Sequence, residues 1–266
     1  MTTSDDGQWV EPVAGFEYLP DTIEVSPAHQ AEKLEACGLD ADIYAGLVDP
    51  SFFIGIAIHA GIRSGISAEG NINMLQSLVQ HRPARLGEPL AVRGRITAVT
   101  QVPRGRTIDT DVWFADARGE RVVTARRRSL KPDPDRAGTR GAGERPAAVI
   151  EDVAALTSLA DYELTPDRVR AYSMEGNSIH YELDAAQRAG FRAPLIGGGM
   201  GVHYCMAALW SRFQPETLDL DIYFRRPIFW DDRFTVAARQ HGSRWSAIGL
   251  VKEGKVLTEA RINALA

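Results

Sequence analysis

A short polar stretch in the second half of the chain, EGNSIH at 175–180, places a carboxylate, an amide and an imidazole within six residues. It lies shortly before a run of three glycines at 197–199. A carboxylate and an imidazole five residues apart can hold one water between them when the chain turns around a substrate. Asn, however, also serves simply to make turns. The stretch is therefore either a site for proton transfer or a polar turn, and the elements around it have to decide.

Composition limits the classes of protein to which the chain can belong. Its 266 residues are 44% hydrophobic, which is enough for one large core or two small ones. The formal net charge of −5 argues against broad nucleic-acid binding, and no apolar run reaches the length of a membrane span. The acidic N-terminus is unlike a signal peptide, and Cys37 and Cys205 are too isolated for a disulfide framework or a zinc site. These features predict a cytoplasmic protein with neither nucleic acid nor membrane as a partner.

The chain repeats itself. Shifting the sequence by 144 positions aligns AGLVDPSFFIGIAIH (45–59) with AGFRAPLIGGGMGVH (189–203), including a histidine at the end of each segment. At the same offset Arg82-Pro83 falls on Arg226-Pro227. Further on, GERVVTAR at 119–126 aligns with GKVLTEAR at 254–261 at an offset of 135, so the hairpin between is nine residues longer in the first copy. The repeat predicts two similar modules.

A segment without bulky apolar residues separates the two copies. KPDPDRAGTRGAGERPAA, at 131–148, is rich in Pro, Gly and charge, which is typical of a linker. We therefore expect a first module at 10–130, a linker at 131–150 and a second module at 151–266.

Each module has the same predicted order of elements. Ser26-Pro27 and Thr165-Pro166 each combine an N-cap with a proline at the first helical position. In the second module a helix follows near 199–213, with apolar residues at intervals of three and four. Strands are expected after it at 218–224, 234–240, 245–253 and 255–265. The fold class is therefore α+β, with an antiparallel sheet wrapped around a long helix in each module. We expect the two sheets to join into one.

The copies differ at the polar stretch. The second copy gains residues between its first helix and its Ala-Gly pair, and the gain falls at 175–180. The first copy reads EACGLDADIYAG there, without an imidazole or a side-chain amide. A polar insertion in one copy of a duplicated scaffold indicates that this copy carries a site.

The second half resembles the MaoC-like (R)-specific enoyl-CoA hydratases and hydroxyacyl-thioester dehydratases of the double hot-dog type. That family's motif runs from an aromatic residue through Asp-x-Asn-Pro-x-His and Ala-Gly to Pro-Ile-x-His-Gly-Met. Here Tyr172, the stretch at 175–180, Ala-Gly-Phe at 189–191 and PLIGGGM at 194–200 follow that pattern. FRRPIFWDD at 224–232 also resembles the family's later strand and turn. Three departures stand out: Glu in place of Asp, Ser in place of Pro, and Gly in place of the His before the helix.

The resemblance implies a lyase of fatty acid metabolism that reversibly hydrates a 2-enoyl-CoA to a 3-hydroxyacyl-CoA. Glu175 and His180 would be the catalytic pair around one water, and Asn177 would orient the loop or the water. Gly198 is the better candidate for polarising the thioester carbonyl through its backbone N–H, with Gly199 beside it. Tyr172 either lines the substrate pocket or is plain helix packing.

The resemblance also implies the partners. The substrate would be an acyl-CoA or an acyl-carrier thioester, with coenzyme A as part of the substrate and no metal or redox cofactor, and a homodimer is left open. The first module would lack the catalytic motif and shape the acyl pocket. Two other readings stay open: a hot-dog thioesterase, and a non-catalytic subunit that binds acyl thioesters. ARRRSLK, at 125–131, either meets the coenzyme A phosphates or is a solvated strand end.

Overall fold

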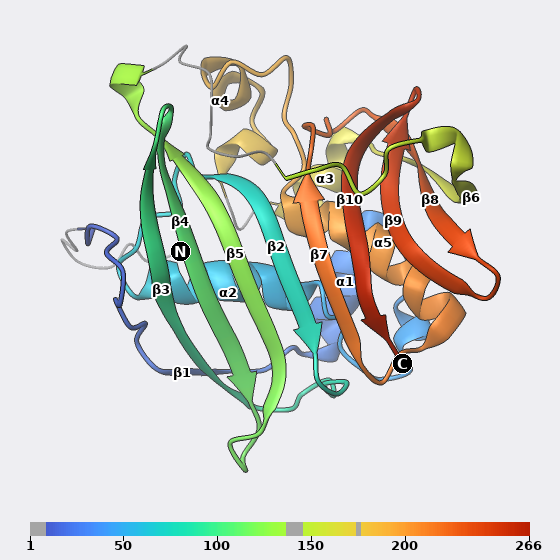
Figure 1. Ribbon diagram of the computed structural model, residues 1–266, viewed down its shortest axis with the longest axis horizontal. Helices are drawn as coiled ribbons and strands as arrows, with labels where there is room; N and C mark the ends of the chain where they lie inside the picture. Colours follow the sequence, from blue (N-terminus) through green and yellow to red (C-terminus); the bar gives the residue numbers. More distant parts are fainter. Residues whose placement is uncertain (1–8, 137–145, 174–176) are drawn as a thin grey trace.

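The computed structural model describes residues 9–136, 146–173 and 177–266. Within them a ten-stranded sheet forms one layer of the molecule, and the long helices pack against one face of this sheet (Figure 1). The strand order is β1-β3-β4-β5-β2-β7-β10-β9-β8-β6, and neighbouring strands of this sheet are antiparallel throughout. The predicted α+β class, with two antiparallel sheets joined into one, is confirmed.

The first module supplies five strands to one half of the sheet. Its elements in chain order are β1 (Asp21–Ile23), α1 (Pro27–Cys37), the 3-10 helix η1 (Ala41–Tyr44), α2 (Phe52–Arg63), β2 (Ile72–Gln80), β3 (Leu90–Val102), β4 (Gly105–Ala115) and β5 (Arg121–Pro132), followed by η2 (Pro134–Arg136).

The second module repeats this order with two additional short helices. Its elements are η3 (Val153–Ala155), β6 (Thr157–Glu163), α3 (Pro166–Ser173), η4 (Ser178–His180), α4 (Leu183–Arg188), α5 (Gly198–Phe213), β7 (Leu218–Phe224), β8 (Arg233–His241), β9 (Arg244–Lys252) and β10 (Lys255–Leu265). The hairpin β3–β4 is longer than β8–β9, as the change of offset along the sequence predicts.

The helix ends follow from local chemistry. The Ser26 hydroxyl accepts a hydrogen bond from the N–H of His29, and Gly38 ends α1 in the left-handed conformation at φ 71°. The hydroxyl of Thr165 accepts from Arg168 N in the same way. Helix α5 has mostly buried side chains, because the sheet curves around it.

Among the described residues no helix combines the length and the apolar character that crossing a bilayer would require.

The two modules meet at strands β2 and β7. Ser77 lies directly opposite Asp221, and the Ser77 hydroxyl donates to Asp221 Oδ1 at 2.5 Å. These two positions are separated by 144 residues, which is the offset of the repeat. In a two-fold interface the residue on the axis faces its own copy. The pseudo-two-fold axis of the duplicated chain therefore passes between Ser77 and Asp221.

The offset of 144 does not hold across the helices. The N–H of Val48 donates to Ala84 O, and the N–H of Ile196 donates to Ile228 O. These paired contacts match positions 46–48 with 194–196, an offset of 148. Four residues are close to one helical turn, so the apolar spacing of the helix fits either offset. The match of His59 with His203 is therefore wrong: His59 is exposed, whereas His203 is fully buried.

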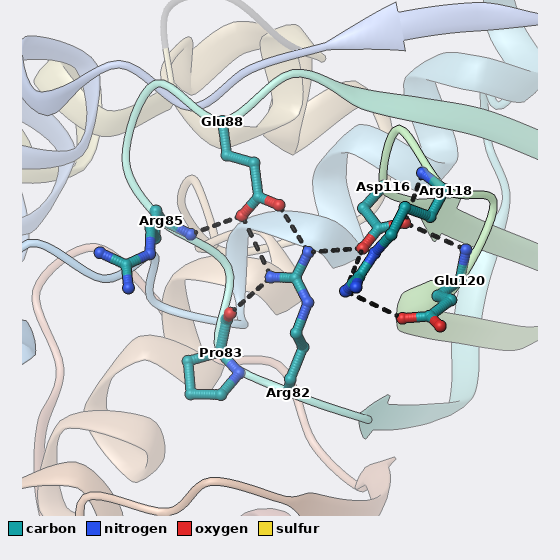
Figure 2. A network of polar contacts seen from close by, with 7 residues as sticks. All are labelled: Arg82, Pro83, Arg85, Glu88, Asp116, Arg118 and Glu120. Atoms are coloured by element: carbon teal, nitrogen blue, oxygen red, sulfur yellow. Dashed lines mark hydrogen bonds and ion pairs between the residues drawn. The ribbon is translucent and has the colours of Figure 1, made fainter.

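A pair of equivalent loops follows the central strands. Glu88 accepts a hydrogen bond from Arg85 N, as Asp232 accepts one from Phe229 N at the equivalent place. Figure 2 shows the first of these loops, where the Arg82 guanidinium bridges the carboxylates of Glu88 and Asp116. The bridge ties the loop after β2 to the turn between β4 and β5. The carboxylate and its backbone contact are repeated, although the cations differ: Arg82 binds Glu88, whereas Arg192 and Lys252 bind Asp232.

The end of the predicted linker is docked on the second module. Val149 and Ile150 are buried, and their N–H groups donate to the two oxygens of Glu259 at 3.0 and 2.7 Å. Arg225 also binds Glu259, with Nε 2.6 Å from Oε1. The predicted linker therefore ends before residue 149, and residues 149 and 150 belong to the core of the second module.

Placing a second carboxylate on the pseudo-axis should destabilise the joined sheet. In Ser77→Asp two like charges lie directly opposite each other, which we expect to lower the free energy of unfolding by about 1 kcal/mol or more. The double variant Ser77→Asp with Asp221→Ser swaps the two residues and should restore most of the loss. Urea unfolding of both, with Ser77→Ala as a neutral control, checks this. If the swap is no more stable than Ser77→Asp, the axis does not lie there.

Candidate active site

The start of α5 is the centre of the candidate site. Gly197 is its N-cap and supplies no side-chain hydrogen bond, and the N–H groups at the first helical positions have no intrahelical acceptor. A Cβ on Gly198 would lie 2.8 Å from Cε1 of Phe224 on β7. Glycine therefore lets the helix begin close to the sheet, with Gly198 and Gly199 presenting N–H groups at the positive end of the helix dipole.

His180 faces this helix start in a defined tautomer. Its Nδ1 lies 2.7 Å from the carbonyl oxygen of Leu195. A carbonyl can only accept, so Nδ1 carries the proton and Nε2 keeps its lone pair. Nε2 lies 3.8 Å from the position that a Cβ would take on Gly197. Burial lowers the pKa of the imidazole, although the bond to Leu195 opposes the shift. At neutral pH His180 is therefore an uncharged hydrogen-bond acceptor.

The other two predicted catalytic residues have different outcomes. Asn177 is exposed, and its side-chain oxygen accepts from Ile179 N at 3.3 Å, which caps η4. Its observed contact orients the loop that carries His180. Glu175 lies outside the described residues, so its role as the base stays a prediction.

Tyr172 stands beside the same helix start. Its hydroxyl lies 3.5 Å from the Cβ position of Gly199 and 2.9 Å from Nε2 of His203. His203 Nδ1 lies 2.7 Å from Oδ2 of Asp49, so the proton is on Nδ1 and the Tyr172 hydroxyl donates to Nε2. Burial holds the pKa of Tyr172 well above its usual range, which keeps the hydroxyl protonated. The structure thus brings together Tyr172, His180 and the glycines at 197–199.

The equivalent helix start in the first module is blocked. At the offset of 148, Asp49 stands where the second module has Gly197. The Asp49 carboxylate accepts from Ser51 N at 2.8 Å and from the Tyr44 hydroxyl at 2.7 Å, in addition to its contact with His203. The Asp49 carboxylate therefore occupies the N–H of Ser51, whose equivalent at α5 is Gly199, and Pro50, the equivalent of Gly198, has no N–H to offer.

The residue by which the first module reaches this place was not predicted from the sequence. Asn73, on β2, has its Nδ2 atom 3.3 Å from the Cβ position of Gly198. It reaches α5 because β2 pairs with β7, a contact that no local motif encodes.

Within the described ranges no group of three or more His, Cys, Asp or Glu side chains is arranged to hold a metal ion.

No family model and no curated protein matches the sequence. Solved structures do. HtdX from Mycobacterium tuberculosis is 20% identical over 91% of this chain and 98% of that chain, with a TM-score of 0.73. A MaoC-like dehydratase from Phytophthora capsici is 15% identical over 96% and 98%, with a TM-score of 0.72. A conserved hypothetical protein of M. tuberculosis, described as having a double hotdog fold, is 14% identical over 94% and 95%, with a TM-score of 0.56.

The chain has a double hot-dog fold. The same fold occurs in a putative oleoyl thioesterase from Lactobacillus plantarum, which is 12% identical over 92% of this chain and 94% of that chain, with a TM-score of 0.58. The double hot-dog fold explains why the helix start of α5 meets residues of both halves. The likeness concerns the fold, and the chemistry has to be argued from the side chains at the start of α5.

Gly55, near the start of α2, and Gly198, at the start of α5, should respond oppositely to substitution by alanine. A Cβ on Gly55 meets no atom within 4 Å, so Gly55→Ala should raise the free energy of unfolding by about 0.5–1 kcal/mol through helix propensity. Gly198→Ala must displace Phe224 or the helix and should lower it by about 1–3 kcal/mol. Denaturant unfolding of the two variants measures the difference. Equal stability of both would mean that Phe224 does not constrain the helix start.

His180 should titrate below pH 6.5. Because burial lowers its pKa in the folded state, the unfolded chain takes up the proton first. The stability that the neutral ring contributes is therefore complete above pH 6.5 and is lost as the pH falls toward the folded pKa. An NMR titration of the imidazole signals, with His180→Gln to assign the resonance, gives the midpoint. A midpoint at or above 6.5 would contradict the neutral, carbonyl-bound ring.

Proposed function

We propose that the protein is an enoyl-thioester hydratase, or the dehydratase of the reverse reaction, with its active site at the start of α5. The observation that carries the proposal is the juxtaposition of two groups there. His180 presents an unprotonated Nε2 toward Gly197, and the next two residues present N–H groups that have no acceptor among the described residues. One is an acceptor for water, and the other is a donor for an oxyanion. The likeness to a MaoC-like dehydratase in fold supports the same reaction class.

The helix start suits the thioester carbonyl. Addition of water to a 2-enoyl thioester makes the carbonyl oxygen negative as the bond to C3 forms, so stabilising that oxygen lowers the barrier. The Gly198 N–H lies at the positive end of a 16-residue helix, and a single donor of this kind contributes about 2.7–4 kcal/mol. The amide of Asn73 lies close enough to Gly198 to border the bound thioester.

The water would be held by two acceptors. Its two O–H groups would be shared between the Glu175 carboxylate and His180 Nε2, which leaves an oxygen lone pair for C3. The pair takes one proton from the water as the new C–O bond forms and returns a proton to C2. One water is added overall, and both side chains return to their starting protonation state. The cap that Asn177 forms on η4 positions His180 for this role.

One active site per chain fits the blocked helix of the first module. There the Asp49 carboxylate already occupies the N–H of the N-cap residue Ser51, and Phe52 and Phe53 are buried in the core. A developing oxyanion would be repelled by that carboxylate. We infer that the first module is catalytically silent and contributes walls and contacts to the site of the second.

A single assay separates the competing functions. The purified protein is mixed with a 2-enoyl-CoA, and enoyl absorbance and free thiol are followed together. Loss of the enoyl signal without thiol release means hydration. Thiol release means the thioesterase reading, which the fold of the L. plantarum protein keeps open. Neither signal, together with measurable binding, leaves a thioester-binding subunit.

Hydration should depend on Glu175 and His180 as a unit. Glu175→Gln and His180→Ala should each lower kcat on the order of 100-fold or more, with the fold and thioester binding largely intact. The double variant should be scarcely worse than either single one, because residues that act on one water lose their effect together. Glu175→Asp should also fall, because a shorter side chain misses the water by about 1.5 Å. Full activity in Glu175→Gln would refute the proposal.

A further inference from the structure

Three consecutive arginines on β5 face in different directions. Arg126 and Arg128 lie on the outer face of the sheet, where Arg126 binds Asp111 and Arg128 forms a two-pronged pair with Asp109 at 2.7 and 3.0 Å. Arg127 lies between them, and successive side chains of a strand alternate. Its neighbours across the sheet are Gln76 on β2 and Thr110 on β4. Arg127 therefore points to the inner face, toward the helices.

No carboxylate of the described residues neutralises Arg127. Its Nε atom is closed off from solvent and has no hydrogen-bond partner. Burial lowers the pKa of the guanidinium to about 10, and Tyr18 is the one titratable side chain that influences it. Burial raises the pKa of Tyr18, so its hydroxyl stays neutral. Arg127 is a cation on the inner face without an anion.

Arg127 lacks a hydrogen-bond acceptor for its buried Nε–H. A guanidinium offers only donors, and it matches a carboxylate through two parallel hydrogen bonds. Its side chain is only partly buried, so the guanidinium is not sealed off from a ligand. A buried guanidinium nitrogen without a partner does not stabilise the fold, so the contacts of Nε give no structural reason for an arginine at this position.

Arg127 lies on the same inner face as the contact with the active site. Asn73, which reaches Gly198, is paired across the sheet with Ser129, and Ser129 is two residues from Arg127 on β5. Two residues along a strand span roughly 7 Å. A chain that starts at Gly198 and passes Asn73 along this face therefore arrives at Arg127 after a short distance.

We propose that Arg127 binds a carboxylate at the far end of the acyl chain, so that the protein acts on thioesters of dicarboxylic acyl groups. The inference rests on the proposed function, because that function places the thioester at Gly198. The first module then determines substrate specificity, because its Arg127 binds the end of the acyl chain that lies away from the thioester. The arginine is matched to the substrate by charge and by its two-pronged geometry.

Binding of paired ligands tests the inference without turnover. Saturated acyl-CoAs with a terminal methyl group are compared with acyl-CoAs of equal length that end in a carboxylate, over a series of lengths, by titration calorimetry. At one length the carboxylate should tighten binding about tenfold or more. Arg127→Met should abolish that gap, and Arg127→Lys should keep part of it. Arg128→Met, which removes a neighbouring arginine from the outer face, should leave it unchanged.

The outcomes separate this inference from the proposed function. Equal affinity within every pair, or a gap that survives in Arg127→Met, overturns the role of Arg127 even if enoyl thioesters are hydrated. A gap that depends on Arg127 without hydration of any enoyl thioester supports the binding site and overturns the hydratase. Thermal unfolding adds an independent measure, since Arg127→Met should be as stable as the parent or more so. If Arg127→Met unfolds at a clearly lower temperature and Arg127→Lys shows no gap, the arginine is structural.

Discussion

The pairing of β2 with β7 is the constraint on which the other features depend. It joins two half-sheets into one and sets their register, with Ser77 facing Asp221. Because of that register, Asn73 of the first module reaches the start of α5 in the second. The same arrangement brings Asp49 to His203. A shift of the pairing by one residue would turn every side chain of β2 to the other face and would remove Asn73 from the site.

Duplication made the two helix starts equivalent, and local chemistry made them different. At α2 the carboxylate of Asp49 accepts from the N–H of the N-cap residue Ser51 and from two buried side chains, Tyr44 and His203. At α5 three glycines leave the corresponding groups open, and Phe224 leaves no room for a side chain at the middle one. An electrostatically favourable place for an anion is thus filled from within in one half and available in the other. The asymmetry lies in a few side chains, whereas the backbone is shared.

The four strands after α5 were predicted from the sequence because alternation is a local pattern, whereas the edge strands β1 and β6 were not predicted. The alternating segment at 218–224 became β7 with those bounds, and offsets of 144 and 135 both survive in the register, where Ser77 faces Arg126 and Asp221 faces Arg261. The helix offset was wrong because a shift of four residues preserves helical periodicity. The tautomer of His180 depends on the carbonyl of Leu195, 15 residues away. The contact of Asn73 depends on a strand pair across the modules, and the inward direction of Arg127 depends on the phase of β5, neither of which single residues reveal.

The position of β2 also has a consequence for synthesis of the chain. Strands β3, β4 and β5 follow β2 directly, so the first half-sheet is complete once residue 132 has left the ribosome. Its partner β7 begins only at Leu218, and at about 5–20 residues per second it emerges several seconds later. During that interval β2 is an edge strand, and its nine residues, INMLQSLVQ, carry no charge to discourage pairing with another chain. The strand that joins the two half-sheets of the finished protein is therefore an unpaired edge during synthesis, where it can pair with another chain and aggregate.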